Sequence, residues 1–121
     1  MRIAVGGLNR NQMEAAVRKA APDAEVIPTN DMQGASMLKQ GKADYYFGAC
    51  NSGGGAAISI LVGLVGYSKC CTVCKNGSTP DKKEIEDFVK QGKIVFGMTV
   101  DSMEKTVLLL VEALKEYGSA K

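Results

Sequence analysis

Short apolar runs alternate with amphipathic stretches along the whole 121-residue chain. The runs rich in aliphatic and aromatic residues predict five β-strands, at residues 2–7, 24–30, 43–49, 68–75 and 94–100. The stretches between and after them predict five helices, at residues 9–21, 31–42, 56–66, 81–93 and 101–118.

This alternation favours a single α/β domain over residues 1–121 with a parallel sheet. Most of the predicted strands are apolar throughout, which is typical of strands covered by helices on both faces. Right-handed crossovers then leave a few doubly wound topologies. We expect a three-layer, doubly wound, parallel five-stranded sheet with the flavodoxin-like strand order 2-1-3-4-5.

Two of the predicted helices carry signals of their own. In the helix at 31–42, Asp31 is a candidate N-cap and Gly41 a candidate C-terminal stop. The helix at 56–66 is apolar on every side, so we expect it to be buried in the core or in an interface. An interface would make the protein a homodimer or a non-catalytic partner subunit of a metabolic complex.

Charge and targeting signals narrow the choice of partners. The formal net charge is +2 and the basic residues are scattered, so we expect neither nucleic acid nor an acidic membrane as a partner. No signal peptide precedes the first predicted strand, and the strongly apolar stretch at 56–65 is too short to span a bilayer. We therefore expect a cytoplasmic protein whose four cysteines are thiols.

The segment CNSGGG at residues 50–55 joins the third predicted strand to the apolar helix. Ligands of doubly wound sheets bind at the carboxyl ends of the strands where the strand order reverses, here between strands one and three. Glycines let the backbone approach a ligand, and the N–H groups at the start of a helix bind anions. We therefore predict a site for a small anionic metabolite, with contacts from Gly6, Gly7, Asn9, Asn51, Ser52, Gly53, Gly54, Gly55 and Thr99.

A purely structural interpretation of this segment stays open. Asn51 or Ser52 would then cap the following helix, and the glycines would only allow tight packing of helix on strand. The segment is neither a Walker A loop nor a dinucleotide-binding fingerprint, because neither glycine pattern occurs in it.

The chain contains no histidine, so the commonest general base and the commonest zinc ligand are both absent. Cys50, beside a helix N-terminus, is the residue expected to act as base or nucleophile if the protein is an enzyme. Cys70, Cys71 and Cys74 would complete a set of four thiols, but residues three apart on a strand point to opposite faces. We therefore predict no metal and no cofactor. With the expected strand order, Cys74 at the end of the fourth strand could still neighbour Cys50 across the pocket.

Several strings, above all DYYFGACNSGGGAAISI at residues 44–60, resemble the YhfU-like family of small bacterial proteins of unknown function. This resemblance covers almost the whole chain and implies a bacterial, cytoplasmic protein. A weaker, local resemblance links FGACNSGGGAAISI to a loop of type B ribose-5-phosphate isomerases. It implies that Cys50 is the base and that Ser52, Gly53 and Gly55 line the loop. The Asp-His pair that follows the first strand of those isomerases is replaced here by Gly7-Leu8.

These observations together predict a protein that binds an anionic or phosphorylated small metabolite at the glycine-rich segment after the third strand. One alternative is an enzyme similar to sugar-phosphate isomerases, with Cys50 as its base. The other is the non-catalytic partner subunit of a metabolic complex.

Overall fold

Strands and helices alternate along the chain, as the sequence predicts. The computed structural model describes residues 1–51 and 58–118. The strands are β1 (Arg2–Gly7), β2 (Glu25–Pro28), β3 (Tyr45–Cys50), β4 (Cys70–Cys74) and β5 (Val95–Thr99). The helices are α1 (Arg10–Ala20), α2 (Asp31–Lys39), α3 (Ser59–Val65), α4 (Lys82–Lys90) and α5 (Met103–Tyr117), with short 3-10 turns at η2 (Tyr67–Lys69) and η3 (Val100–Ser102).

The five strands form one parallel sheet in the order β2-β1-β3-β5-β4. The parallel α/β class is confirmed, but the predicted order 2-1-3-4-5 is wrong, because β5 lies between β3 and β4. Every residue of β5 is buried, whereas Thr72 in β4 is only half-buried. The strand that is buried throughout therefore takes the interior position, and β4 forms an edge of the sheet.

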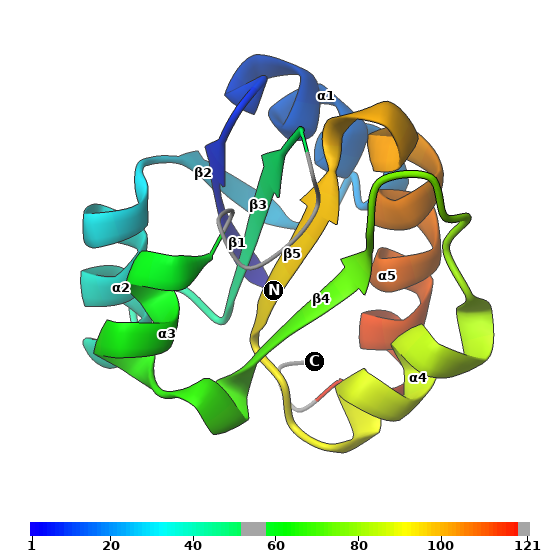
Figure 1. Cartoon of the computed structure of the whole chain (residues 1–121). Helices are drawn as coiled ribbons and strands as arrows, with labels where there is room; N and C mark the ends of the chain where they lie inside the picture. The colour runs from blue at the N-terminus through cyan, green and yellow to red at the C-terminus, as the bar shows by residue number, and fades with distance from the viewer. Residues whose placement is uncertain (52–57, 119–121) are drawn as a thin grey trace.

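Helices cover both faces of this sheet (Figure 1). α2 and α3 pack on one face, and α1, α4 and α5 pack on the other. Right-handed crossovers account for the division. The connections from β1 to β2 and from β4 to β5 run in one direction across the sheet, and those from β2 to β3 and from β3 to β4 run in the other.

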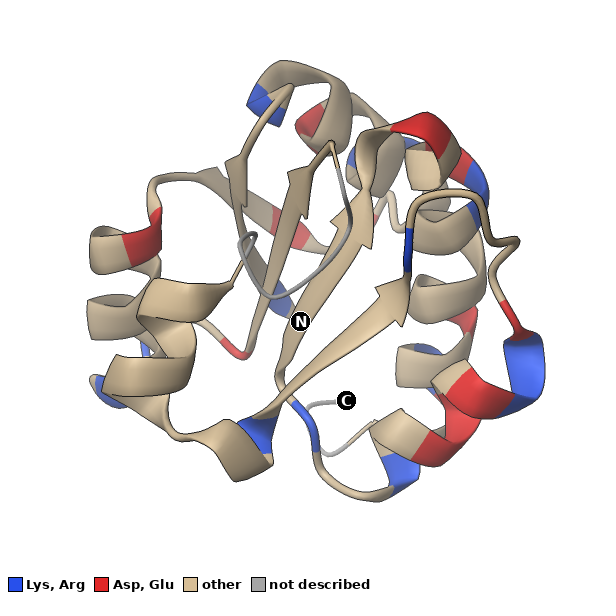
Figure 2. Cartoon of the chain, viewed as in Figure 1, with Lys and Arg blue, Asp and Glu red and all other residues tan. Residues whose placement is uncertain are grey.

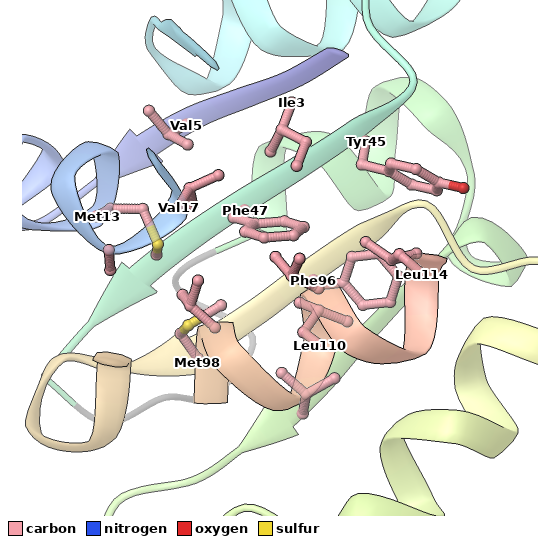
Figure 3. Close-up of a cluster of buried hydrophobic side chains, with 14 of the residues drawn as sticks. Ile3, Val5, Met13, Val17, Tyr45, Phe47, Phe96, Met98, Leu110 and Leu114 are labelled. Atoms are coloured by element: carbon pink, nitrogen blue, oxygen red, sulfur yellow. The ribbon is translucent and has the colours of Figure 1, made fainter. Parts of the chain in front are cut away.

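The larger core lies between the sheet and the helices α1, α4 and α5. Phe47 of β3 and Phe96 of β5 meet there edge to face, with ring centroids 5.8 Å apart and ring planes at 87°. Figure 3 shows the two rings among aliphatic side chains from the sheet and from α5. Such an aromatic pair adds about 0.5–1.5 kcal/mol to the stabilisation from burial alone. It also ties the two central strands together below the edge where they end.

The helix α3 is less buried than its sequence suggests. Leu61 is fully buried, but Ile60 and Leu64 are 43% and 41% exposed. The prediction that this helix is buried in the core is therefore wrong, because one face of α3 is enough to cover its part of the sheet. The prediction that α3 forms an interface is untouched by this exposure.

Charged residues of both signs are interspersed over the helices and loops, and the strands are mostly uncharged (Figure 2). Within residues 1–51 and 58–118, the helices are too short or too polar for any of them to cross a bilayer. The charge pattern thus agrees with the prediction of a mixed, solvated surface.

Candidate functional site

The carboxyl ends of the five strands meet at one edge of the sheet, because all of the strands are parallel. β2 and β3 lie on opposite sides of β1, so the strand order reverses between β1 and β3, as predicted. At this point Gly7 is in register with Ala49, and Cys50 is in register with Thr99. The predicted site residues at the ends of β1, β3 and β5 therefore lie close to one another.

The two glycines that end β1 are required by their surroundings. Gly7 has a φ of +81°, and a Cβ at this position would lie 2.5 Å from the carbonyl oxygen of Ala49. A Cβ on Gly6 would collide with the hydroxyl group of Tyr46. Backbone conformation and packing account for both glycines, and a contact between either of them and a ligand stays a prediction.

A cleft of about 470 Å³ opens at this edge, between the loop after β1 and the loop after β2. Two of the predicted ligand-binding residues, Gly7 and Asn9, line it. Asn9 precedes α1 in a left-handed conformation, and its Nδ2 donates a hydrogen bond to Oε1 of Gln12 at 3.1 Å. The side chain of Asn9 does not cap α1, so no N-cap side chain accepts a hydrogen bond from the first N–H groups of this helix beside the cleft. The other lining residues are Arg10, Asn11, Thr29, Asn30 and Asp31.

Arg10 is a lining residue that the sequence analysis missed. It is the first residue of α1, and its Nη1 donates a hydrogen bond to the carbonyl oxygen of Thr29 at 3.0 Å. This bond ties the guanidinium to the loop after β2. A cation is unfavourable at the positive end of a helix dipole. That unfavourable placement, three residues after Gly7, is the signal in the sequence by which Arg10 could have been found.

The prediction that Asp31 caps α2 is wrong. The N-cap is Asn30, whose Oδ1 accepts a hydrogen bond from the backbone N–H of Gln33 at 2.8 Å. Asn30 has the extended backbone of an N-cap residue, with φ −127° and ψ 176°, whereas Asp31 already belongs to the helix. The carboxylate of Asp31 instead accepts a hydrogen bond from the hydroxyl of Tyr46 through Oδ1.

Tyr46, the second residue of β3, reaches Asp31 at the wall of the cleft. Its side chain is fully buried. Burial, together with the hydrogen bond to Asp31, raises the pKa of Tyr46 well above the usual value for tyrosine. The phenol is therefore protonated at neutral pH and serves as a donor to the carboxylate. The strand pattern of the sequence locates Tyr46 in β3 but does not show that its hydroxyl reaches α2.

Cys50 ends β3 and is half-buried. Its side chain packs against the smaller core under α2 and α3. Thr99 is buried, and its Oγ1 donates a hydrogen bond to the carbonyl oxygen of Asn51 at 3.3 Å. The structure thus brings together Cys50, Asn51 and Thr99. The predicted ligand-binding residues Ser52, Gly53, Gly54 and Gly55 lie outside the described residues.

The remaining cysteines of β4 lie in other surroundings. β5 separates β4 from β3, so the prediction that Cys74 lies near Cys50 fails with the predicted strand order. Cys74 Sγ instead accepts a hydrogen bond from Oγ of Ser102 at 3.1 Å. The prediction that Cys71 and Cys74 point to opposite faces is also wrong, because the register shifts between Thr72 and Cys74 and both thiols join the larger core. In the part of the chain that the structure describes, no three or more His, Cys, Asp or Glu side chains form a group that could hold a metal ion.

The arrangement of strands and helices defines the class of protein. Type B ribose 5-phosphate isomerase from Trypanosoma cruzi has a similar structure, with a TM-score of 0.72 and 13% sequence identity over 100% of this chain and 89% of that chain. Ribose-5-phosphate isomerase B from Giardia lamblia matches with a TM-score of 0.71 and 15% identity, over 98% of this chain and 96% of that chain. At such identities the likeness establishes the fold alone. The chain is an α/β protein with the fold of type B ribose-5-phosphate isomerases.

Sequence similarity then gives the family. The family described as "Protein of unknown function DUF2620" matches residues 1–114 of this chain. The uncharacterized protein YhfU from Escherichia coli (strain K12) is 40% identical over 115 residues, which cover 94% of this chain and 98% of that protein. The relative from Shigella flexneri matches to the same extent. The chain belongs to the DUF2620 family, and the resemblance to YhfU-like proteins noted in the sequence is confirmed.

Proposed function

We propose that the protein binds a small anionic metabolite, one that carries a phosphate or carboxylate group, in the cleft between the loops after β1 and β2. The observation that carries this proposal is Arg10. Its guanidinium lines the cleft and is held there by the carbonyl oxygen of Thr29. A guanidinium with several N–H donors is well suited to phosphate and carboxylate groups.

The start of α1 favours an anion at the same place. Asn9 provides no side-chain cap, and the first turn of α1 contains no acidic residue. The unpaired N–H groups and the positive end of the helix dipole therefore have no anionic partner within α1. The N-termini of α2 and α4, by contrast, are capped by the side chains of Asn30 and Asp81. An anion at α1 would be bound by the helix and by Arg10 together.

The size and the place of the cleft agree with a small metabolite. Its volume of about 470 Å³ lies within the range of roughly 300–1,000 Å³ that is usual for small-molecule sites. It opens beside the switch point between β1 and β3, where doubly wound proteins bind their ligands. The backbone N–H groups of Ser52 to Gly55 belong to the same proposal as a second anion-binding element, on the grounds of the sequence alone.

Isothermal titration calorimetry tests the proposal. Inorganic phosphate, ribose 5-phosphate and simple carboxylates are titrated into the wild type and into Arg10→Gln, which we expect to bind about tenfold or more weakly. Lys19→Gln is the matched control, because it removes the same charge from the same helix at a side chain that is 83% exposed. Equal losses of binding affinity in both variants would contradict a specific site, since they would reflect general electrostatic attraction.

A second function, the isomerisation of a sugar phosphate with Cys50 as the base, is favoured by the position of Cys50. Ala49 precedes it in β3 and is the register partner of Gly7, which lines the cleft. The fold is shared with enzymes named for ribose 5-phosphate. A base at this edge would move a proton between adjacent carbons of an open-chain sugar phosphate. Turnover of ribose 5-phosphate that is equal in the wild type and in Cys50→Ser would exclude this role.

The predicted homodimer or partner subunit would use exposed apolar residues of α2 and α3. Met32, Ile60 and Leu64 are 63%, 43% and 41% exposed. Met32 and Leu64 also line one groove of about 400 Å³ between the two helices. Light scattering coupled to size-exclusion chromatography should show a dimer that dissociates in Leu64→Glu. A wild-type monomer at high protein concentration would contradict the homodimer.

A further inference from the structure

The wall of the cleft contains a carboxylate that is held in place from the sheet. Asp31 is half-buried and lines the cleft, and its Oδ1 accepts a hydrogen bond from the hydroxyl of Tyr46. Oδ2 of Asp31 has no hydrogen-bond partner among the described residues. Since a carboxylate can accept several hydrogen bonds, Asp31 has acceptor capacity left for a group in the cleft.

Three elements cooperate to bring Tyr46 to this carboxylate. The phenol ring comes from β3, and a Cβ on Gly34 of α2 would lie 2.5 Å from its Cε2 atom. On the other side, a Cβ on Gly6 of β1 would collide with the hydroxyl. A glycine inside a helix costs about 1 kcal/mol relative to alanine, and the ring of Tyr46 is what occupies the space that Gly34 leaves. The packing of Tyr46 against Gly34 and Gly6 therefore fixes the hydrogen bond between Tyr46 and Asp31.

Asp31 is not needed to end the helix. Asn30 supplies the side-chain cap of α2. Asp31 lies in the first turn of α2, so its carboxyl group is at the positive end of the helix dipole. The hydroxyl of Tyr46 then fixes the direction in which this carboxylate points.

The guanidinium of Arg10 lines the same cleft and does not pair with Asp31. Arg10 lines the cleft, but it forms no ion pair within 4.0 Å with Asp31, and both residues belong to the described part of the chain. A simple anion placed at Arg10 gains from the guanidinium and is opposed by the nearby carboxylate. A ligand that combines an anionic group with hydroxyl groups gains from both residues, because a hydroxyl donates to Asp31 while the anion lies at Arg10.

We infer that the cleft selects hydroxylated anions, such as sugar phosphates or sugar acids, over anions without hydroxyl groups. Asp31 is the acceptor for a ligand hydroxyl, and Tyr46 is the positioning residue that orients Asp31. This inference rests on the proposed function, because it requires an anion at Arg10. It adds the chemical class of the ligand and gives Asp31 and Tyr46 roles in ligand binding that the sequence did not indicate.

Matched pairs of ligands test the inference by calorimetry. Glycerol 3-phosphate and propyl phosphate differ only in hydroxyl groups, and so do glycerate and propionate. We expect the wild type to bind the hydroxylated member of a pair about tenfold more tightly, as a hydrogen bond to a charged group allows. The two pairs also distinguish a phosphate ester from a carboxylate as the anionic group.

Two variants separate this inference from the proposed function. Asp31→Ala should abolish the preference for the hydroxylated ligands, while propyl phosphate still binds. Tyr46→Phe should lower this preference although Asp31 is still present. Asp87→Ala, on α4, is the control and should keep the full preference. Equal binding of both members by the wild type, or a preference that survives in Asp31→Ala, would overturn the inference and leave the proposed function standing. If the wild type binds no member of either pair, the proposed function fails and the inference with it.

Discussion

Gly34 of α2 lies against the ring of Tyr46 so closely that a Cβ at position 34 would come within 2.5 Å of Cε2 and 2.6 Å of Cδ2. Tyr46 is fully buried in the strand β3, so its ring has little room to move away. This contact lets the hydroxyl of Tyr46 reach Asp31 at the cleft. The packing of α2 on the sheet therefore determines the geometry of the proposed site.

The first prediction concerns this contact. We expect Gly34→Ala to lower the free energy of unfolding, because overpacking of about 1–3 kcal/mol outweighs a gain of about 1 kcal/mol in helix propensity. Gly63→Ala in α3 is the control, since nothing lies within 4 Å of a Cβ at that position. The control should be neutral or more stable by up to about 1 kcal/mol. Urea denaturation measures the free energy of unfolding of both variants. An equal gain in stability in both would show that a methyl group fits between position 34 and the ring of Tyr46.

The second prediction concerns stability at alkaline pH. Burial raises the pKa of the Cys71 thiol from 9.0 to about 12. The unfolded chain therefore loses this proton at lower pH than the folded chain does. The stabilisation is complete below pH 9 and is lost as the pH rises towards 12, with a slope of at most about 1.4 kcal/mol per pH unit. Tyr46, whose pKa is also raised by burial, acts in the same direction.

Urea unfolding midpoints on both sides of pH 9 measure this effect. Cys71→Ala should show a shallower decline with pH than the wild type, since one titrating group is removed. Val73→Ala is the control, because it removes a buried side chain from the same strand without removing an ionisable group. It should lower stability by a similar amount at every pH. Parallel curves for the wild type and Cys71→Ala would contradict the assignment.

The third prediction concerns the accessibility of the thiols. Cys50 is half-buried, whereas Cys70, Cys71 and Cys74 are buried with exposed fractions of 6%, 8% and 4%. A thiol reagent added to the native protein should therefore modify Cys50 first, and Cys50→Ser should remove the fast phase. Mass spectrometry of digested samples identifies the modified residue. A fast phase that persists in Cys50→Ser would show that one of the β4 thiols is more accessible than its burial indicates.

The fourth prediction concerns the strand order. The edge-to-face contact of Phe47 with Phe96 exists only if β3 and β5 are neighbours. A double-mutant cycle with Phe47→Leu and Phe96→Leu should give a coupling energy of about 0.5–1.5 kcal/mol. Phe47→Leu combined with Val26→Ala should be additive, because β1 lies between β2 and β3. A coupling energy of zero between the two phenylalanines would contradict the contact between β3 and β5.

The class of fold was predictable because strand-like and helix-like patterns alternate clearly from Arg2 to Tyr117. The strand order was not, since β4 and β5 are both short and apolar and either order obeys right-handed crossovers. CCTVC and VFGMT each contain one threonine, Thr72 in the middle of β4 and Thr99 at the end of β5. The position of one threonine within a strand is weak information about which of two strands lies at the edge.

The position of the candidate site in the fold was predictable, but the side chains around the cleft were predictable only in part. The rule for switch points indicated the edge of the sheet where Gly7 and Asn9 line a cleft and Cys50 ends β3, and the binding of a ligand there stays a prediction. Arg10 was missed because scattered cations usually belong to a solvated surface. The pair of Tyr46 and Asp31 was missed because it depends on how α2 packs across β3, and no local pattern in the sequence encodes that contact.

The central claim is that an anion binds at Arg10 and the start of α1. The most direct measurement is a titration of the 15N-labelled protein with ribose 5-phosphate, followed by amide chemical shifts. We predict saturable shifts that are largest for the amides of residues 9–11, at the start of α1, and 29–31, at the start of α2. No saturable shift at millimolar ligand, or shifts confined to α4 and α5, would contradict the proposed site.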